Sequence, residues 1–213
     1  MPEGGTAMYA RSTSFDGDPH RIDDAVHYVR DKAMPALMGM DGYIGVSMLA
    51  DRESGRCIIT SSWDDVTSLH RSASEMRGMR ARAADILQSP PALEEWRIAL
   101  LHRERSAPGG ARTRVTWCRT EPARLDPTLD AYAETVVPRL ADLPGFCSVS
   151  VMADPAEGRS ATAVTFVDGA ALDGAMTQLA PVLEEFSRQR ASEATGEGTF
   201  DLVLAHLRVP ETV

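Results

Sequence analysis

An internal repeat with a separation of 103 residues is the feature that most limits how this chain can fold. Residues 46–56 (VSMLADRESGR) align with residues 149–159 (VSVMADPAEGR), and six of the eleven positions are identical. Because turn residues and apolar residues match in the same order, we predict a duplicated unit of about 100 residues. The predicted units are residues 1–104 and 112–213, joined by a linker at 105–111. Further pairs at the same separation are Pro35 and Pro138, Leu37 and Leu140, Gly42 and Gly145, Tyr43 and Phe146, and Trp63 and Phe166.

Each unit is predicted to contain strand, helix, strand, strand, helix and strand in that order. In the first unit the strands are expected at 8–15, 43–50, 56–63 and 95–102. Its first helix begins at Asp18-Pro19 and is interrupted by Pro35, and its second helix, capped by Asp64 or Asp65, ends before Ser89. In the second unit we expect a strand at 114–119, a helix opening at Asp126-Pro127, a hairpin at 147–167, a helix at 170–194 and a strand at 199–207.

This order of elements is that of a ferredoxin-like α+β unit, with four antiparallel strands and both helices on one face of the sheet. The runs 57–59 and 98–101 are apolar at consecutive positions, which is typical of strands that are buried on both faces. Two tandem ferredoxin-like units with their open sheet faces against each other would satisfy this pattern. We therefore predict a fused dimeric α+β barrel, present as a monomeric pseudo-dimer or as a homodimer.

Composition excludes several classes of protein. The net charge of −9 is spread over both halves, so neither half has the basic surface of a nucleic-acid-binding domain. No apolar run approaches the roughly 18 residues of a membrane span, and residues 1–11 do not resemble a secretion signal. The cysteines, Cys57, Cys118 and Cys147, have neither disulfide-framework nor zinc spacing, so we expect a cytoplasmic protein without a metal.

The segments MPAL, Gly-Tyr, VSMLAD, a strand that ends in Trp63, and the following DDVTSLH resemble the antibiotic biosynthesis monooxygenase (ABM) domain. Both units are covered by the resemblance, which extends to two-domain actinobacterial proteins of this type. The resemblance implies a dimeric α+β barrel. Relatives with the ABM fold include oxygenases that use O2 without a cofactor on aromatic polyketides, as well as haem-degrading enzymes. Quinone-forming and haem-degrading relatives place an asparagine near a tryptophan, whereas this sequence contains no asparagine.

The resemblance implies that Trp63 is the tryptophan at the strand end, where it would position a substrate ring or simply seal the core. His70 lies near the histidine of the family's second helix. It is interpreted as a substrate-binding or acid–base residue, as a solvated helix residue, or as a haem ligand. Tyr9 and His27 are candidates for handling a substrate proton, with structural roles as the alternative. Met76 is the candidate substrate contact among the methionines of the first unit, which also suit ordinary core packing.

The second unit lacks these groups, since Phe166 and Asp173 occupy the positions of Trp63 and His70. Any active site is therefore expected in the first unit. The basic residues of its second helix, among them Arg80, are interpreted as a solvated face, with an anion site as the alternative. Two functions remain open. One is an ABM-type monooxygenase that acts on a small aromatic or apolar compound without haem, flavin or metal. The other is a non-catalytic small-molecule-binding or stress-associated protein on the same scaffold.

Overall fold

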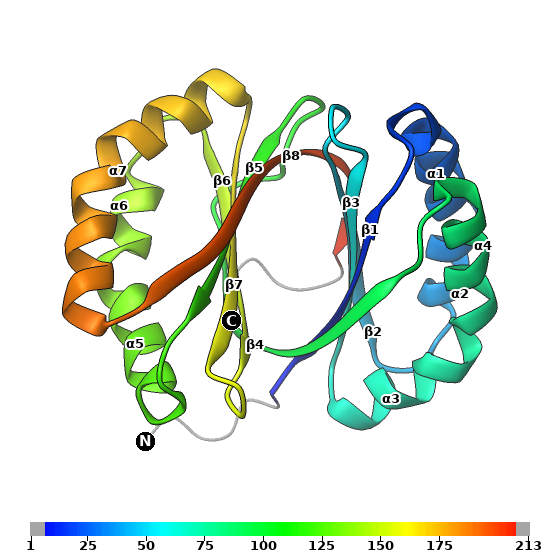
Figure 1. Cartoon of the computed structure of the whole chain (residues 1–213), viewed down its shortest axis with the longest axis horizontal. Helices are drawn as coiled ribbons and strands as arrows, with labels where there is room; N and C mark the ends of the chain where they lie inside the picture. The colour runs from blue at the N-terminus through cyan, green and yellow to red at the C-terminus, as the bar shows by residue number, and fades with distance from the viewer. Residues whose placement is uncertain (1–6, 208–213) are drawn as a thin grey trace. The chain divides into compact units, whose positions relative to one another are not determined.

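A computed structural model describes residues 7–207 as an α+β protein in which both halves of the sequence contain the expected order of elements (Figure 1). The first half comprises β1 (Tyr9–Asp16), α1 (Ile22–Tyr28), α2 (Met34–Met38), β2 (Tyr43–Ala50), β3 (Arg56–Trp63), α3 (Val66–Glu75), α4 (Arg77–Leu87) and β4 (Ala92–Arg103). The second half comprises β5 (Arg112–Arg119), α5 (Pro122–Thr135), α6 (Val137–Ala141), β6 (Phe146–Asp154), β7 (Arg159–Phe166), α7 (Gly169–Arg190) and β8 (Glu193–Leu207).

The described residues divide into two compact units that each include part of β4 and part of β8. The first unit contains residues 7–97 and 202–207, and the second contains residues 98–201. Hydrogen-bonded neighbours follow the order β4, β1, β3, β2, β8 in the first unit and β4, β6, β7, β5, β8 in the second. The predicted boundaries follow the sequence repeat rather than these contacts, and they stay a prediction.

In the first unit, the helices cover one face of the sheet (Figure 1). The core between them contains Phe15, Met48 and Trp63 from the strands, together with Ile22 and Leu87 from the helices. Pro35 interrupts the first helix as the sequence predicts. A π-helical turn at Val29–Ala33 precedes the short helix α2, because a proline removes one helical hydrogen bond and crowds the turn before it.

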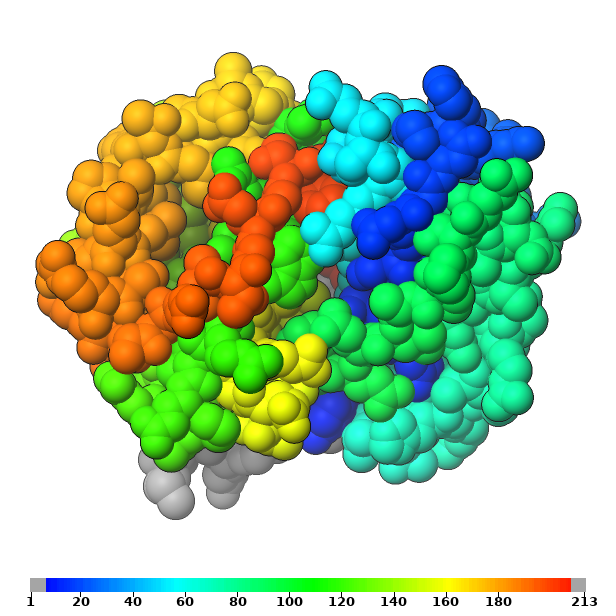
Figure 2. Space-filling view, viewed as in Figure 1, coloured from blue at the N-terminus to red at the C-terminus, as the bar shows by residue number. Residues whose placement is uncertain are grey.

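Matching turns hold the hairpins of the two units. The amide of Gly17 donates to the carbonyl of Gly55 at 3.1 Å, and the amide of Thr120 donates to the carbonyl of Gly158 at 2.8 Å, again 103 residues further on. In Figure 2 the loop at 51–55 (cyan) lies against residues 16–21 (blue) at the surface of the first unit. A Cβ on Gly55 or Gly158 would approach a backbone carbonyl oxygen to 2.0 Å, and both φ angles are positive, so glycine is required.

The structure corrects several predicted boundaries. Helix α5 begins at Pro122 rather than at Asp126-Pro127, because Pro122 is the counterpart of Pro19 in the repeat, and Pro127 lies inside the helix. The predicted helix at 170–194 ends at Arg190, where Ala191 adopts a left-handed conformation, and β8 starts at Glu193 instead of residue 199. The predicted second helix of the first unit is divided at Met76 into α3 and α4, and Asp65 rather than Asp64 is its cap.

No helix in the part of the chain that the structure describes combines the length and the apolar character needed to pass through a bilayer.

Candidate functional site

A hollow lies between the sheet and the helices of the first unit, and we call it the first-unit hollow. It contains about 50 Å³ of space for the centres of water-sized molecules, and about 530 Å³ when the space out to open solvent is included. An apolar cavity of roughly 150 Å³ holds benzene, so an aromatic ring would enter only if lining side chains moved. The lining residues are Arg11, Thr13, Phe15, Tyr28, Val29, Ala33, Leu37, Ile59, Ser61, Met76, Met79, Arg80 and Ala83.

Two of the lining residues are methionines from the junction between α3 and α4. Met76 is 8% exposed and is part of the first-unit core, and Met79 packs against that core. Unbranched thioether side chains have several accessible rotamers and adapt to irregular ligands. The wall formed by Met76 and Met79 is therefore the part of the hollow best able to yield to a ring.

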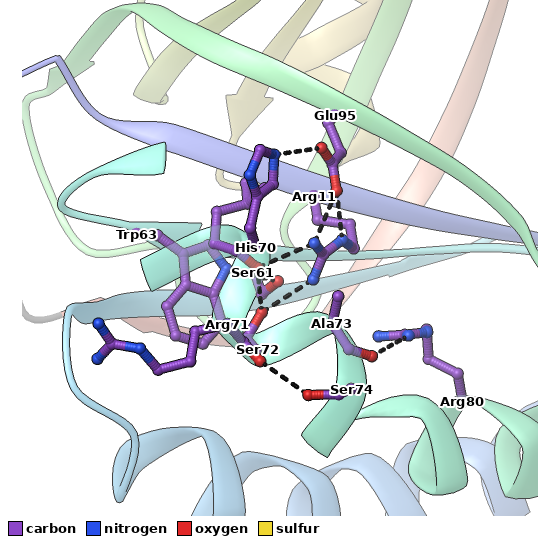
Figure 3. A network of polar contacts seen from close by, with 11 residues as sticks. Arg11, Ser61, Trp63, His70, Arg71, Ser72, Ala73, Ser74, Arg80 and Glu95 are labelled. Carbon is purple, nitrogen blue, oxygen red and sulfur yellow. Dashed lines mark hydrogen bonds and ion pairs between the residues drawn. The ribbon is translucent and has the colours of Figure 1, made fainter. Parts of the chain in front are cut away.

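Arg11 brings a positive charge to the sheet side of the hollow. Its side chain is 4% exposed and projects from β1 on the same face as Thr13 and Phe15. Figure 3 shows the guanidinium group in a network: it donates to Oε1 of Glu95 at 2.7 and 3.1 Å, to Oγ of Ser72 at 2.9 Å and to the carbonyl of Leu69 at 2.9 Å. The contacts tie α3 to β1 and β4, and the carboxylate of Glu95 neutralises the buried charge.

His70 contacts the solvent-exposed edge of this network. Its side chain is 62% exposed, and its Nε2 lies 3.2 Å from Oε2 of Glu95, whose other oxygen binds Arg11 (Figure 3). His70 does not line the first-unit hollow. The geometry therefore connects His70 to the hollow only through Glu95 and Arg11.

Arg80 extends from α4 along the helix side of the hollow. Its Nη2 donates to the carbonyl of Ala73 on α3 at 2.6 Å (Figure 3). Within residues 7–207, no carboxylate lies within 4.0 Å of this guanidinium group. Burial lowers the pKa of Arg80, and the positive charges of Arg11 and Arg77 lower it further, while Glu95 raises it. The interpretation of Arg80 as part of a solvated face is wrong, since the side chain is half-buried and lines the hollow.

The phenol side chain of Tyr28 is a further polar group in the lining. Tyr28, at the end of α1, faces the hollow and is packed against the first-unit core. Burial raises the pKa of Tyr28, and the nearby Arg82 opposes this shift only in part. The phenol is therefore protonated at neutral pH and can donate one hydrogen bond to a ligand.

The second unit has larger side chains at the positions that keep the first-unit hollow open. Val29 and Ala83 line the hollow, and their counterparts 103 residues later are Tyr132 and Phe186. These two rings pack edge to face in the second unit with centroids 5.7 Å apart. Leu183 and Ala175 stand at the positions of Arg80 and Ser72, so the second unit also lacks the second cation and the hydroxyl that binds the first.

Of the site residues predicted from the sequence, only Met76 lines the first-unit hollow. Trp63 is fully buried, donates from Nε1 to Oγ of Ser61 at 3.2 Å, and packs edge to face on Tyr43. It borders a separate, more polar hollow of about 160 Å³ between α3 and the turn before β2. Tyr9 is half-buried on β1 against the first-unit core, where it pairs with Trp63 and Arg97.

His27 lies apart from the others on the exposed side of α1. Its Nδ1 donates to the carbonyl of Asp23 at 2.7 Å. The structure thus places Tyr9, Trp63 and His70 near the α3 end of the sheet and leaves His27 on the outside of a helix. The roles suggested for these residues stay predictions.

Sequence analysis missed Arg11, Glu95 and Tyr28. A signal was present for Arg11, because the alternation in β1 places it on the face that also carries the buried Phe15. Arg80 likewise interrupts the apolar face of the second helix in the sequence. A charged residue at an inward position indicates either a buried ion pair or a ligand, and only the structure shows Glu95 beside Arg11.

No protein-family model matches the chain. Among solved structures, a candidate monooxygenase from Fusobacterium nucleatum is similar with a TM-score of 0.73 and 10% identity, covering 98% of each chain. An anthrone oxidase-like protein is similar with a TM-score of 0.65 and 13% identity, covering 97% of this chain and 95% of the other. A Listeria monocytogenes ferredoxin-fold protein related to antibiotic biosynthesis monooxygenases has a TM-score of 0.53 and 10% identity, covering 93% and 96%.

The fold is therefore that of the ABM-related ferredoxin-fold proteins, as the sequence resemblance indicates. Two sequence relatives identify the family of the chain. The chain is 40% identical to the uncharacterised Mycobacterium tuberculosis proteins Rv2557, over 98% of this chain and 93% of that protein, and Rv2558, over 98% and 89%. It belongs to the family that contains these two proteins.

Proposed function

We propose that the first-unit hollow is the ligand site of this protein and that its ligand is a compact aromatic or apolar compound oxidised there by O2. The observation that carries the proposal is the difference between the units. The first unit keeps Val29 and Ala83 beside an open space, whereas the second has Tyr132 and Phe186 at the same positions of the repeat. Side chains that leave part of a core unfilled lose dispersion contacts, so an empty hollow needs a reason.

The reaction we propose is monooxygenation of a phenol. A phenol with a hydrogen on the para carbon reacts with O2 to give a quinone and water, with one oxygen atom in the new carbonyl and the other in water. Loss of the phenolic proton makes the ring electron-rich enough to reduce O2. The cations of Arg11 and Arg80 would stabilise that phenolate, since both line the hollow. This proposal requires no haem, flavin or metal, in keeping with the expectation from the sequence.

A second candidate is a protein that binds its ligand without converting it. The observation that favours it is the position of His70 and Trp63, neither of which lines the first-unit hollow. Oxidation of a phenol in this hollow would therefore need the ligand itself or water to take up the phenolic proton. The two candidates share the ligand site and differ only in the consumption of oxygen.

We propose that the open sheet faces of two tandem units lie against each other in a fused dimeric α+β barrel. Burial of Leu49, Ile58 and Trp96, which point away from the helices of the first unit, supports this arrangement.

The test uses the purified full-length chain and a series of single-ring phenols. We expect binding in the micromolar to millimolar range by ligand-detected NMR, and oxygen uptake with quinone formation for a phenol that is also a substrate. Ala83→Phe copies the second unit and should abolish both signals while the circular dichroism spectrum is retained. Binding without oxygen uptake would favour the second candidate. Equal binding to the wild type and Ala83→Phe would contradict the site itself.

A further inference from the structure

Arg80 is the least satisfied charged group in the wall of the first-unit hollow. Its guanidinium group has five N–H donors, and among the described residues one acceptor lies within hydrogen-bond distance, the carbonyl of Ala73 at 2.6 Å. Arg11, by contrast, has a carboxylate partner in Glu95 and two further acceptors. A half-buried cation without a carboxylate loses hydration that its surroundings do not replace.

The charges around Arg80 leave a local excess of positive charge. Arg11 and Arg77 are close enough to lower its pKa, and Arg82 acts on Tyr28 in the same wall. The opposing charge comes from Glu95, which is already shared between Arg11 and His70. One negative charge in the hollow would therefore improve the electrostatic balance, and a guanidinium group can hold a carboxylate through two parallel hydrogen bonds.

The rest of the lining sets the shape and polarity of the ligand. Apolar side chains form most of the wall, and its polar groups besides the two arginines are the hydroxyls of Thr13, Tyr28 and Ser61. The small volume excludes a bulky molecule such as a nucleotide. A single ring or a short branched chain with one terminal acid group meets these conditions.

We propose that the first-unit hollow is selective for compact organic monocarboxylates and that Arg80 is the residue that recognises the carboxylate. This inference rests on the proposed function, because it names the class of ligand for the same site. Arg80 contacts the carboxylate directly, and the apolar body packs between Met76, Met79 and Ala83. The second unit has Leu183 in place of Arg80 and is not expected to bind such an anion.

The test compares two probes of nearly equal size, benzoate and benzamide, titrated into the wild type, Arg80→Gln, Arg80→Lys and Arg77→Gln. The wild type should bind benzoate at least tenfold more tightly than benzamide, and moderate salt should weaken only benzoate. Arg80→Gln should lose this preference, and Arg80→Lys should retain part of it through its charge. Arg77→Gln is the matched charge control, since Arg77 is an exposed arginine on the same helix that does not line the hollow. It should weaken benzoate binding less than Arg80→Gln does and should keep the preference for benzoate over benzamide.

The outcomes separate this inference from the proposed function. If benzamide and benzoate bind equally and Arg80→Gln changes neither, the selectivity for carboxylates is wrong while the ligand site stands. If neither these probes nor the phenols bind, both proposals are wrong. Thermal unfolding of each variant accompanies the titrations, and Arg80→Lys provides the decisive comparison if Arg80→Gln fails to fold.

Discussion

Arg11 links three elements of the first unit, because its guanidinium group joins β1 to both β4 and α3. The side chain is 4% exposed, and its carboxylate partner Glu95 is 45% exposed. Removing one member of such a pair leaves the other charge buried without compensation, which costs more than the intact pair contributes. The second unit provides a natural comparison in Arg114 and Glu197, which are 25% and 66% exposed.

We expect Glu95→Gln to lower the free energy of unfolding by about 1–3 kcal/mol, less than for a fully buried pair because solvent screens the exposed half of Glu95. Glu197→Gln should cost less than about 1 kcal/mol, since that pair is largely at the surface. Urea unfolding of both variants at neutral pH measures the two values. Equal losses would show that the network around Arg11 adds no more to stability than the exposed pair of Arg114 and Glu197.

At the scale of elements, residues that determine turns made much of the fold predictable. The predicted bounds of β2 and β3 agree with the structure because Gly42 and Gly55, both with positive φ, mark the turns before and between these strands. The end of α7 was missed because Ala191 adopts the left-handed conformation that usually indicates glycine or asparagine. The start of β8 was missed because residues 193–198 include two glycines, which are uncommon in strands.

The candidate site was less predictable than the elements for a physical reason. Hydrophobic periodicity shows which face of a strand or helix is buried, but it does not show which buried faces fail to fill the space between them. The hollow depends on two residues that are smaller than their counterparts in the second unit. Val29 lies in the turn after α1, and Ala83 lies on α4. That relation between distant residues becomes visible only when the two helices are placed together.

The helix caps provide a prediction at this scale. Asp65 accepts from the amide of Ser68 at 2.6 Å, and Asp168 accepts from the amide of Ala171 at 2.8 Å. The hydrogen bond from the Ser68 amide holds the pKa of the Asp65 carboxyl below its ordinary value. We expect Asp65→Ala and Asp168→Ala to lower the melting temperature at neutral pH to similar extents, because each leaves a helix amide without its cap.

The dependence on pH follows from the sign of this shift. A carboxyl whose pKa is lower in the folded state contributes stability above its unfolded pKa of about 3.9, and the contribution is lost as the pH falls through the folded pKa. The melting temperatures of the wild type and Asp65→Ala should therefore converge below about pH 4. The difference in melting temperature between Asp65→Asn and Asp65→Ala should not narrow in the same way, because neither side chain titrates. A difference between the wild type and Asp65→Ala that persists unchanged to about pH 3 would contradict an ionised cap.

For the whole molecule, the repeat explains how two units with the same fold can differ in function. Contacts that set the fold recur after 103 residues, among them the amides of Asp64 and Val167, which each donate at 2.9 Å to the carbonyl of the glycine before β2 or β6. Most of the side chains that line the first-unit hollow do not recur, since ten of the thirteen positions hold a different residue in the second unit. One copy of a duplicated unit can fill its core with aromatic rings once the other copy alone holds the ligand.

This asymmetry predicts one ligand per chain. Titration of the wild type with benzoate or a phenol should give a stoichiometry of one, with chemical-shift changes confined to residues around the first-unit hollow. Phe186→Ala removes one ring of the Tyr132–Phe186 pair in the second unit. Because Phe186 is half-buried, the change should lower the free energy of unfolding by about 2 kcal/mol, less than the 3–5 kcal/mol typical of a buried phenylalanine. It should leave the affinity and the stoichiometry unchanged, whereas Ala83→Phe should abolish binding and cost about 1–3 kcal/mol, because the added ring is larger than the hollow. Two equivalent ligands per wild-type chain, or loss of binding in Phe186→Ala without unfolding, would refute the assignment of the site to the first unit.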